Sequence, residues 1–206
     1  VNTFNLSETI RLITETYDAH LLHDVIPMGL GGDHTMTLPI LRSIAKKHGP
    51  VALVHVDAHA DVNDEMYGEK ETHGTVFRRA YEEGLITADK VFQIGLRGTG
   101  YTADDFSEAA DWGFNQWLAP ELWHKSLSPL AAEIKEKIGD QKTYITYDID
   151  SLDPSFAPGT GTPEIGGLTT MQAMELIRGL RGLNIVGCDL VEVSPNVDPP
   201  VCRIMD

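Results

Sequence analysis

Short apolar runs alternate along this chain with longer amphipathic segments, a pattern typical of proteins that mix strands and helices. The run Val-Ala-Leu-Val-His-Val at 51–56 is apolar at nearly every position, which indicates a strand buried on both faces. Comparable runs predict further strands at 24–30, 90–96, 113–118, 143–149 and 184–191. Of these, 24–30 is weakened by Pro27, and 113–118 gives a weaker signal than the others.

Amphipathic segments between these runs predict helices at 8–20, 35–47, 74–83, 103–111, 129–138 and 170–181. Ser7 and Thr169 stand where N-capping residues are expected for the first and the last of them. Strands that alternate with helices and are apolar almost throughout favour a mainly parallel sheet with helices on both faces. The length of 206 residues allows one large domain over 1–206, and no internal repeat divides it.

Composition narrows the classes of function. The 31 acidic residues outnumber the 16 basic ones, and an acidic surface repels phosphate backbones, so no nucleic-acid partner is expected. The same charge would attract a cationic substrate. No apolar run is long enough to span a bilayer, and the two widely separated cysteines suit a reducing compartment. We therefore expect a cytoplasmic protein without membrane contact; an organellar leader stays an alternative because the chain begins at Val1.

Acid and imidazole side chains follow three of the predicted strands. The sequences are Gly-Gly-Asp-His at 31–34, Asp-Ala-His-Ala-Asp at 57–61 and Asp-Ile-Asp at 148–150. Ligand sites in parallel α/β sheets gather beyond the carboxyl ends of the strands, so these side chains are expected to meet at one edge. Such a set suits two divalent metals, and a dinuclear site usually activates water for hydrolysis.

Spacing supports this interpretation at two of the three motifs. Residues two apart on an extended strand face the same side, so Asp148 and Asp150 would bring two buried carboxylates together, at a high desolvation cost unless a cation lies between them. The same period joins Asp57, His59 and Asp61, and this donor set without cysteine favours Mn²⁺ over structural zinc. The alternatives are loop-capping roles for Asp148 and Asp150 and a capping or core role for His34. We expect Asp33 to cap the following helix or to support His34, and not to bind metal directly.

Together the motifs resemble those of the ureohydrolases, the family of arginase, agmatinase and guanidinobutyrase. The resemblance runs from about residue 25 to residue 198 and is nearest to guanidinobutyrase and agmatinase. Besides the motifs above, it rests on His-Gly-Thr at 73–75, Asp-Ile-Asp-Ser-Leu-Asp-Pro at 148–154, Gly-Thr-Gly-Thr-Pro-Glu at 159–164 and Asp-Leu-Val-Glu-Val-Ser-Pro at 189–195. It implies a three-layer α/β/α fold and the hydrolysis of a guanidino group to urea and an amine.

The resemblance also implies roles for individual residues. Two Mn²⁺ ions per subunit are implied, one held by His34, Asp57, Asp61 and Asp148 and the other by Asp57, His59, Asp148 and Asp150. Asp150 would also take a proton from the attacking water, His73 would pass a proton to the departing amine, and Glu192 would pair with the guanidinium. From the residues alone, a surface-loop histidine and a solvated acid are the simpler interpretations of His73 and Glu192.

The loop between the second motif and His-Gly-Thr is expected to select the tail of the substrate. Asn63 matches a position that contacts the substrate carboxylate in arginase, Lys70 adds a positive charge, and Met66 is expected to line the pocket. These residues favour 4-guanidinobutanoate, which would give 4-aminobutanoate and urea. Agmatine is the alternative, because its ammonium group would suit three acids of the same loop, Asp64, Glu65 and Glu69. Ordinary solvated loop charges are the simplest interpretation of these residues.

Both ends of the chain depart from the family pattern. Relatives are longer, and residues 199–206 do not match the family sequence, so we expect a domain truncated at both ends. If it folds intact, the resemblance implies a homo-oligomer, either a trimer or a hexamer. Two other classes compete: a catalytically inert metal-binding fragment, and a zinc deacetylase on a similar fold, which Asp150 and His34 disfavour.

Overall fold

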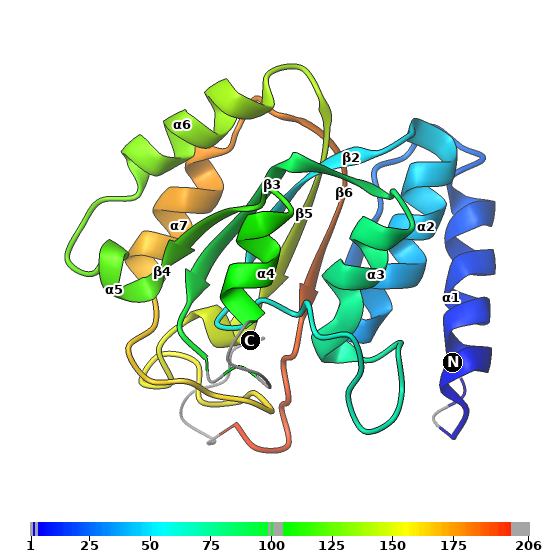
Figure 1. Ribbon diagram of the computed structural model, residues 1–206, viewed down its shortest axis with the longest axis horizontal. Helices are drawn as coiled ribbons and strands as arrows, with labels where there is room; N and C mark the ends of the chain where they lie inside the picture. Colours follow the sequence, from blue (N-terminus) through cyan, green and yellow to red (C-terminus); the bar gives the residue numbers. More distant parts are fainter. Residues whose placement is uncertain (1, 3, 99, 101–104, 199–206) are drawn as a thin grey trace.

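A single parallel sheet organises the computed structural model, which describes residues 2, 4–98, 100 and 105–198 (Figure 1). Its strands are β1 (Met28–Leu30), β2 (Val51–Val56), β3 (Ile86–Leu96), β4 (Asn115–Leu118), β5 (Lys142–Asp148) and β6 (Asn184–Val191). Their order across the sheet is β1-β6-β5-β2-β3-β4. Every pair of neighbours is parallel, so the strands all end at one edge.

Helices cover both faces of this sheet. They are α1 (Leu6–His20), α2 (Thr37–His48), α3 (Val76–Glu82), α4 (Asp105–Asp111), α5 (Ala119–Leu122), α6 (Ser128–Ile138) and α7 (Thr170–Gly179). One hydrophobic cluster packs α1–α4 on one face, and a second packs α5–α7 on the other (Figure 1). Adjacent residues of β2 divide between them, with Leu53 in the first and Val54 in the second. This three-layer arrangement confirms the predicted fold.

Every predicted strand is present, and the boundaries differ where local chemistry intervenes. β1 has only three residues and begins directly after Pro27, which has no N–H to donate. β3 begins at Ile86, before the predicted start at 90, because its pairing with Val51 of β2 begins there. The short helix α5 was not predicted, since four residues show no helical period.

The helix ends follow capping chemistry. Thr169 caps α7 as predicted, and it exchanges hydrogen bonds with Gln172 in a capping box. The first helix begins at Leu6, and its cap is Asn5, which accepts a hydrogen bond from the Glu8 N–H; the prediction of Ser7 was wrong. Of the helix predicted at 103–111, residues 103 and 104 lie outside the described residues, as do 199–206.

The topology explains where function-bearing loops gather. Three 3-10 turns, η1 (His34–Met36), η2 (His73–Thr75) and η3 (Ile149–Ser151), follow strands or their loops at the carboxyl edge of the sheet. β2 and β5 are direct neighbours, while β6 separates β5 from β1. Within the described residues, no helix combines the length and apolarity needed to cross a membrane.

Candidate metal centre

The three predicted motifs meet at the carboxyl edge of the sheet. His34 opens η1 after β1, Asp57 follows β2, and Asp148 ends β5. Each of these three side chains is no more than 2% exposed. Asp33 caps η1 as expected, because its carboxylate accepts a hydrogen bond of 2.9 Å from the Thr35 N–H. The fold therefore brings together side chains that are distant in the sequence.

Turns, and not an extended backbone, give these motifs their common direction. The Asp57 carboxylate accepts the His59 N–H at 2.6 Å, and the Asp148 carboxylate accepts the Asp150 N–H at 2.8 Å. Asp150 lies in η3, and Asp61 has a left-handed φ of 53°. The period of two therefore identified the converging residues, but the chain folds back on itself at each strand end.

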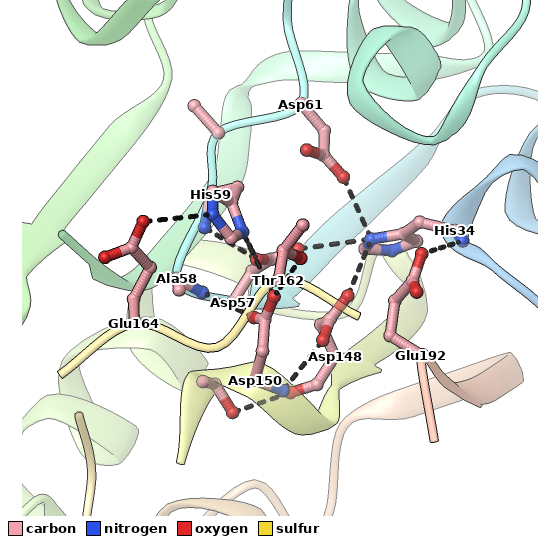
Figure 2. A network of polar contacts seen from close by, with 12 residues as sticks. His34, Asp57, Ala58, His59, Asp61, Asp148, Asp150, Thr162, Glu164 and Glu192 are labelled. Carbon is pink, nitrogen blue, oxygen red and sulfur yellow. Dashed lines mark hydrogen bonds and ion pairs between the residues drawn. The ribbon is translucent and has the colours of Figure 1, made fainter. Parts of the chain in front are cut away.

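Two groups of ligand-type atoms are visible at the centre (Figure 2). His34 Nδ1 lies 3.0 Å from Asp61 Oδ2, 3.1 Å from Asp57 Oδ2 and 3.4 Å from Asp148 Oδ2. This nitrogen is buried, yet it has no hydrogen-bond partner in the described structure. His59 Nδ1 lies 3.1 Å from Asp150 Oδ2 and 3.5 Å from Asp57 Oδ1. Asp57 belongs to both groups, and oxygen and nitrogen donors of this kind fit Mn²⁺ or a similar divalent ion.

Electrostatics also favour a cation here. Burial, together with the charges of Asp57 and Asp150, raises the pKa of Asp148 well above its usual range. Burial lowers the pKa of His59, but Asp150 and Asp57 outweigh it and raise the pKa to about 11. Both shifts favour bound protons on Asp148 and His59. A divalent ion could displace them, and its binding would release protons.

His55 lies close enough to count as a further ligand, but its hydrogen bonds assign it elsewhere. Gln93 Nε2 donates to the Ala60 carbonyl at 2.8 Å, which fixes the orientation of the amide. The same nitrogen faces His55 Nδ1 at 3.1 Å, so Nδ1 accepts and the proton of His55 is on Nε2. Nε2 then donates to Asp57 Oδ2 at 2.7 Å. His55 therefore orients a carboxylate, a role that the sequence reasoning missed.

A cavity of about 260 Å³ opens onto the metal centre. Its lining includes four more of the predicted site residues, Asn63, Met66, His73 and Glu192. Glu192 is strained into a left-handed φ of 61°, and its Oε1 accepts the His34 N–H at 2.8 Å. Burial raises the pKa of Glu192. Glu192 therefore contacts both the cavity and η1, the turn that carries His34.

The predicted tail-selecting loop is only partly turned toward this cavity. Lys70 does not line it; its side chain is 63% exposed and lies 3.8 Å from Asp64. Asp64 accepts a hydrogen bond of 2.8 Å from Arg79, which lowers its pKa. Asn63 does line the cavity: its Nδ2 donates to the Gly74 carbonyl at 3.0 Å, while its buried Oδ1 has no hydrogen-bond partner among the described residues.

Arg97 holds two walls of the cavity together. Its guanidinium donates to the carbonyls of Asp150 and Glu164, both at 2.7 Å. Further bonds reach Gly95, Ser151, Leu152 and Ile165. Because these acceptors belong to the strand end, to the η3 region and to the loop at 164–165, one side chain fixes the backbone of Asp150 relative to the opposite wall.

Gly98 supports His59 by leaving room for its ring. A Cβ at this position would lie 2.3 Å from His59 Cδ2 and 2.6 Å from Nε2. We expect Gly98→Ala to displace the imidazole and weaken Mn²⁺ binding by about 10-fold or more, measured by isothermal titration calorimetry. Gly161→Ala is the matched control, because its Cβ would make only an ordinary contact of 3.7 Å with Glu192. Equal affinities of the two variants would contradict this role.

Asp153 fastens the loop that forms the wall next to Asp150. Its carboxylate accepts hydrogen bonds from Ser155, from the Gly166 N–H at 2.8 Å and from the Gly167 N–H at 3.2 Å. Its contacts with Ser155 are the largest cause of a pKa lowered from 3.8 to about 2.

This lowered pKa makes the contribution of Asp153 depend on pH. The native state binds fewer protons here than the unfolded state, so the stabilisation is present above about pH 4 and is lost as the pH falls toward about 2. We expect Asp153→Asn to cost about 1 kcal/mol at pH 7, after allowance for solvent screening, and to flatten the acid limb of stability in urea titrations. The exposed Asp24→Asn should leave that limb unchanged. Parallel curves for wild type and Asp153→Asn would refute the assignment.

This chain is similar to several known proteins. The Arginase family model matches residues 1–202. Guanidinobutyrase of Pseudomonas aeruginosa is 63% identical over 96% of this chain and 62% of its own length. Mitochondrial agmatinase of Gallus gallus is 54% identical over 96% of this chain and 58% of its own. A solved structure, proclavaminate amidino hydrolase from Streptomyces clavuligerus, shares 37% identity and a TM-score of 0.93 over 98% of this chain and 67% of that one.

This chain thus spans about three fifths of the length of these curated relatives. The similarity nevertheless extends over nearly the whole of this chain, including each of the motifs at the carboxyl edge of the sheet. A family model that matches almost every residue, and relatives with more than half of their aligned residues identical, show that the chain belongs to the arginase family.

Proposed function

We propose that this protein hydrolyses a linear guanidino compound to urea and an amine, with two Mn²⁺ ions per subunit. The observation that carries the proposal is the pair of ligand groups that share Asp57 and open onto a cavity lined by Glu192. The names of the relatives, guanidinobutyrase and agmatinase, support the same chemistry.

The ligand sets of the proposal follow the two groups of atoms. His34, Asp57, Asp61 and Asp148 would hold one ion. Asp57, His59 and Asp150 would hold the other, and the family resemblance adds Asp148 to this second set. When bound, such a pair of ions supplies Lewis acidity that lowers the pKa of water toward neutrality. The described residues that surround the centre contribute no thiolate, which suits a hard or borderline ion.

The remaining steps belong to the side chains. The oxygen of water adds to the guanidino carbon, the bond from that carbon to the alkyl nitrogen breaks, and the nitrogen takes a proton as the amine leaves. Asp150 accepts the proton of the attacking water; its carboxylate is held by the Ala58 N–H at 3.2 Å and the Thr162 hydroxyl at 3.1 Å. His73, which lines the cavity from the start of η2, returns a proton to the amine.

Glu192 binds the guanidinium in this proposal. One of its oxygens is committed to the His34 N–H, and the side chain also lines the cavity, so the second oxygen is left for the substrate. A carboxylate and a guanidinium form charge-assisted hydrogen bonds that gain strength away from water. The described lining of the cavity contains no lysine or arginine, which also favours a cationic group.

The tail of the substrate divides two candidates. 4-Guanidinobutanoate is our first choice, because guanidinobutyrase is the more similar of the two named relatives. Agmatine is favoured by a specific observation: Asn63 presents a buried, unpartnered Oδ1, an acceptor suited to an ammonium group. Lys70 is exposed and does not favour a substrate carboxylate inside the cavity. Asp64 is already paired with Arg79 and does not favour the ammonium group of agmatine.

A homo-oligomer is part of the proposal. The outer surface of α7 exposes apolar side chains, with Met171 69% and Met174 42% exposed, and such a stripe is suited to a subunit contact. Sedimentation analysis of the full chain would test it, and a monomer at micromolar concentration would contradict it.

The decisive experiment is a urea assay on Mn²⁺-loaded protein with 4-guanidinobutanoate, agmatine, arginine and 3-guanidinopropionate in parallel. Urea from the first compound is the expected result. Urea from agmatine alone would support the proposed hydrolysis and would indicate that Asn63 Oδ1 accepts a hydrogen bond from the ammonium group of the substrate. Metal binding without urea from any of the four would overturn the proposed activity in favour of an inert metal-binding fragment.

Replacement of Glu192 tests the guanidinium contact. In Glu192→Gln the amide oxygen can still accept the His34 N–H, so the amide nitrogen, a donor, faces the substrate. We expect KM to rise and kcat/KM to fall by about 10- to 100-fold, the worth of a hydrogen bond to a charged group. Glu65→Gln, in the exposed loop, removes the same charge and should leave both constants near wild type. Wild-type kinetics for Glu192→Gln would show that Glu192 does not bind the guanidinium.

A further inference from the structure

A row of polar side chains crosses the core of the sheet directly beneath the metal centre. Strand pairing aligns Gln116 with Gln93, Gln93 with His55, His55 with Thr146, and Thr146 with Asp189. Four of the five, all except Gln116, are no more than 3% exposed. Polar groups buried between packed layers are costly unless each is hydrogen-bonded, so the partners of these side chains are informative.

The hydroxyl of Thr146 decides the proton position on His34. It donates its single proton to Asp189 Oδ1 at 2.6 Å. Toward His34 Nε2, which lies 2.8 Å away, the same oxygen can only accept. His34 Nε2 therefore carries a proton, and its other ring nitrogen, Nδ1, is the one directed at the carboxylates of the metal centre.

Asp189 is built as an acceptor. Besides Thr146, its carboxylate receives the hydroxyls of Tyr144 at 2.7 Å and Thr37 at 2.8 Å. An ionised carboxylate can only accept hydrogen bonds, so the proton of the Thr146 hydroxyl points toward Asp189 Oδ1. The row ends at Gly29 of β1, where a Cβ would lie 3.2 Å from the Cβ of Asp189. The direction of every hydrogen bond between Asp189 and His34 is thus determined.

From these directions we infer that Thr146 and Asp189 are positioning residues for the metal centre. They hold the ring of His34 in the orientation and tautomer that presents a bare Nδ1 to a metal ion. At the other end of the row, Gln93 sets the proton of His55 toward Asp57. One row of strand residues therefore determines that His34 binds metal and that His55 supports a ligand. The inference rests on the metal site of the proposed function.

Mn²⁺ affinity measured by calorimetry tests this role without any assay of activity. Thr146→Val keeps the shape of the side chain but removes the hydroxyl, and we expect it to weaken one of the two Mn²⁺ sites by about 10- to 100-fold. Thr146→Ser restores the hydroxyl and should restore the affinity. If Thr146→Val does not fold, Thr146→Ala removes the hydroxyl without placing a methyl group against the imidazole.

Tyr144→Phe is the matched control. It also deprives Asp189 of one hydroxyl donor in the core, but Tyr144 makes no contact with His34 among the hydrogen bonds of the row. We expect it to lower the melting temperature as Thr146→Val does and to leave both Mn²⁺ affinities within about threefold of wild type. A merely structural role for the row would move the two variants together.

The outcomes separate the inference from the proposed function. Wild-type affinity in Thr146→Val, or an equal loss in Tyr144→Phe, would overturn the positioning role while the metal site stands. Wild-type protein that binds no Mn²⁺ would overturn both. Loss of one site in Thr146→Val with rescue by serine, even in protein that releases no urea, would support the positioning role and count only against the proposed activity.

Discussion

Mutual repulsion among buried carboxylates is the constraint on which this structure depends. Asp57, Asp61, Asp148 and Asp150 are each at most 8% exposed and converge at one edge of the sheet. At an effective dielectric constant near 20, two unit charges about 4 Å apart repel by about 4 kcal/mol. Several such pairs would together cost as much as the whole free energy of unfolding of a typical domain. Two imidazoles and protons reduce this cost in the protein itself. Divalent ions would remove it, which couples metal binding to folding.

The parallel sheet is what makes this concentration of charge geometrically possible. β2 and β5 are neighbours, so Asp57 and Asp148 leave adjacent strand ends, and each carboxylate closes the turn that follows it. The polar row across the sheet fixes which ring nitrogen of His34 and of His55 carries the proton. Apolar residues in place of Gln93 and Thr146 would leave His55 and His34 free to exchange tautomers, and nothing would then distinguish the histidine that binds metal from the one that supports a ligand.

Sequence alone was sufficient for the fold class and for the converging residues, because apolar runs and strand-end motifs are local signals. It was insufficient where the deciding contact lies on another strand. His55 and Thr146 interrupt apolar runs and were visible as polar residues, but only the register that pairs them with Gln93 and Asp189 reveals their function. The direction of Lys70 could not be predicted for a similar reason, because it depends on ion pairs that Asp64 makes with Lys70 and Arg79. The period of two found Asp150 and Asp61 although neither lies on extended backbone.

Glu192 joins the two halves of the proposed chemistry through its two oxygens and its backbone. Its N–H donates to the Gly32 carbonyl, and its Oε1 accepts the His34 N–H, so the end of β6 and the turn after β1 form one hydrogen-bonded unit. A guanidinium that binds the other oxygen would draw charge away from the bond to the His34 N–H. The ring of His34 faces the carboxylates of the centre on one side and Thr146 on the other. Substrate affinity and metal affinity are therefore expected to be linked, and by reciprocity each ligand changes the affinity for the other by the same factor. Glu192 adopts a left-handed φ of 61° at this strand end, and from there its side chain reaches the His34 N–H.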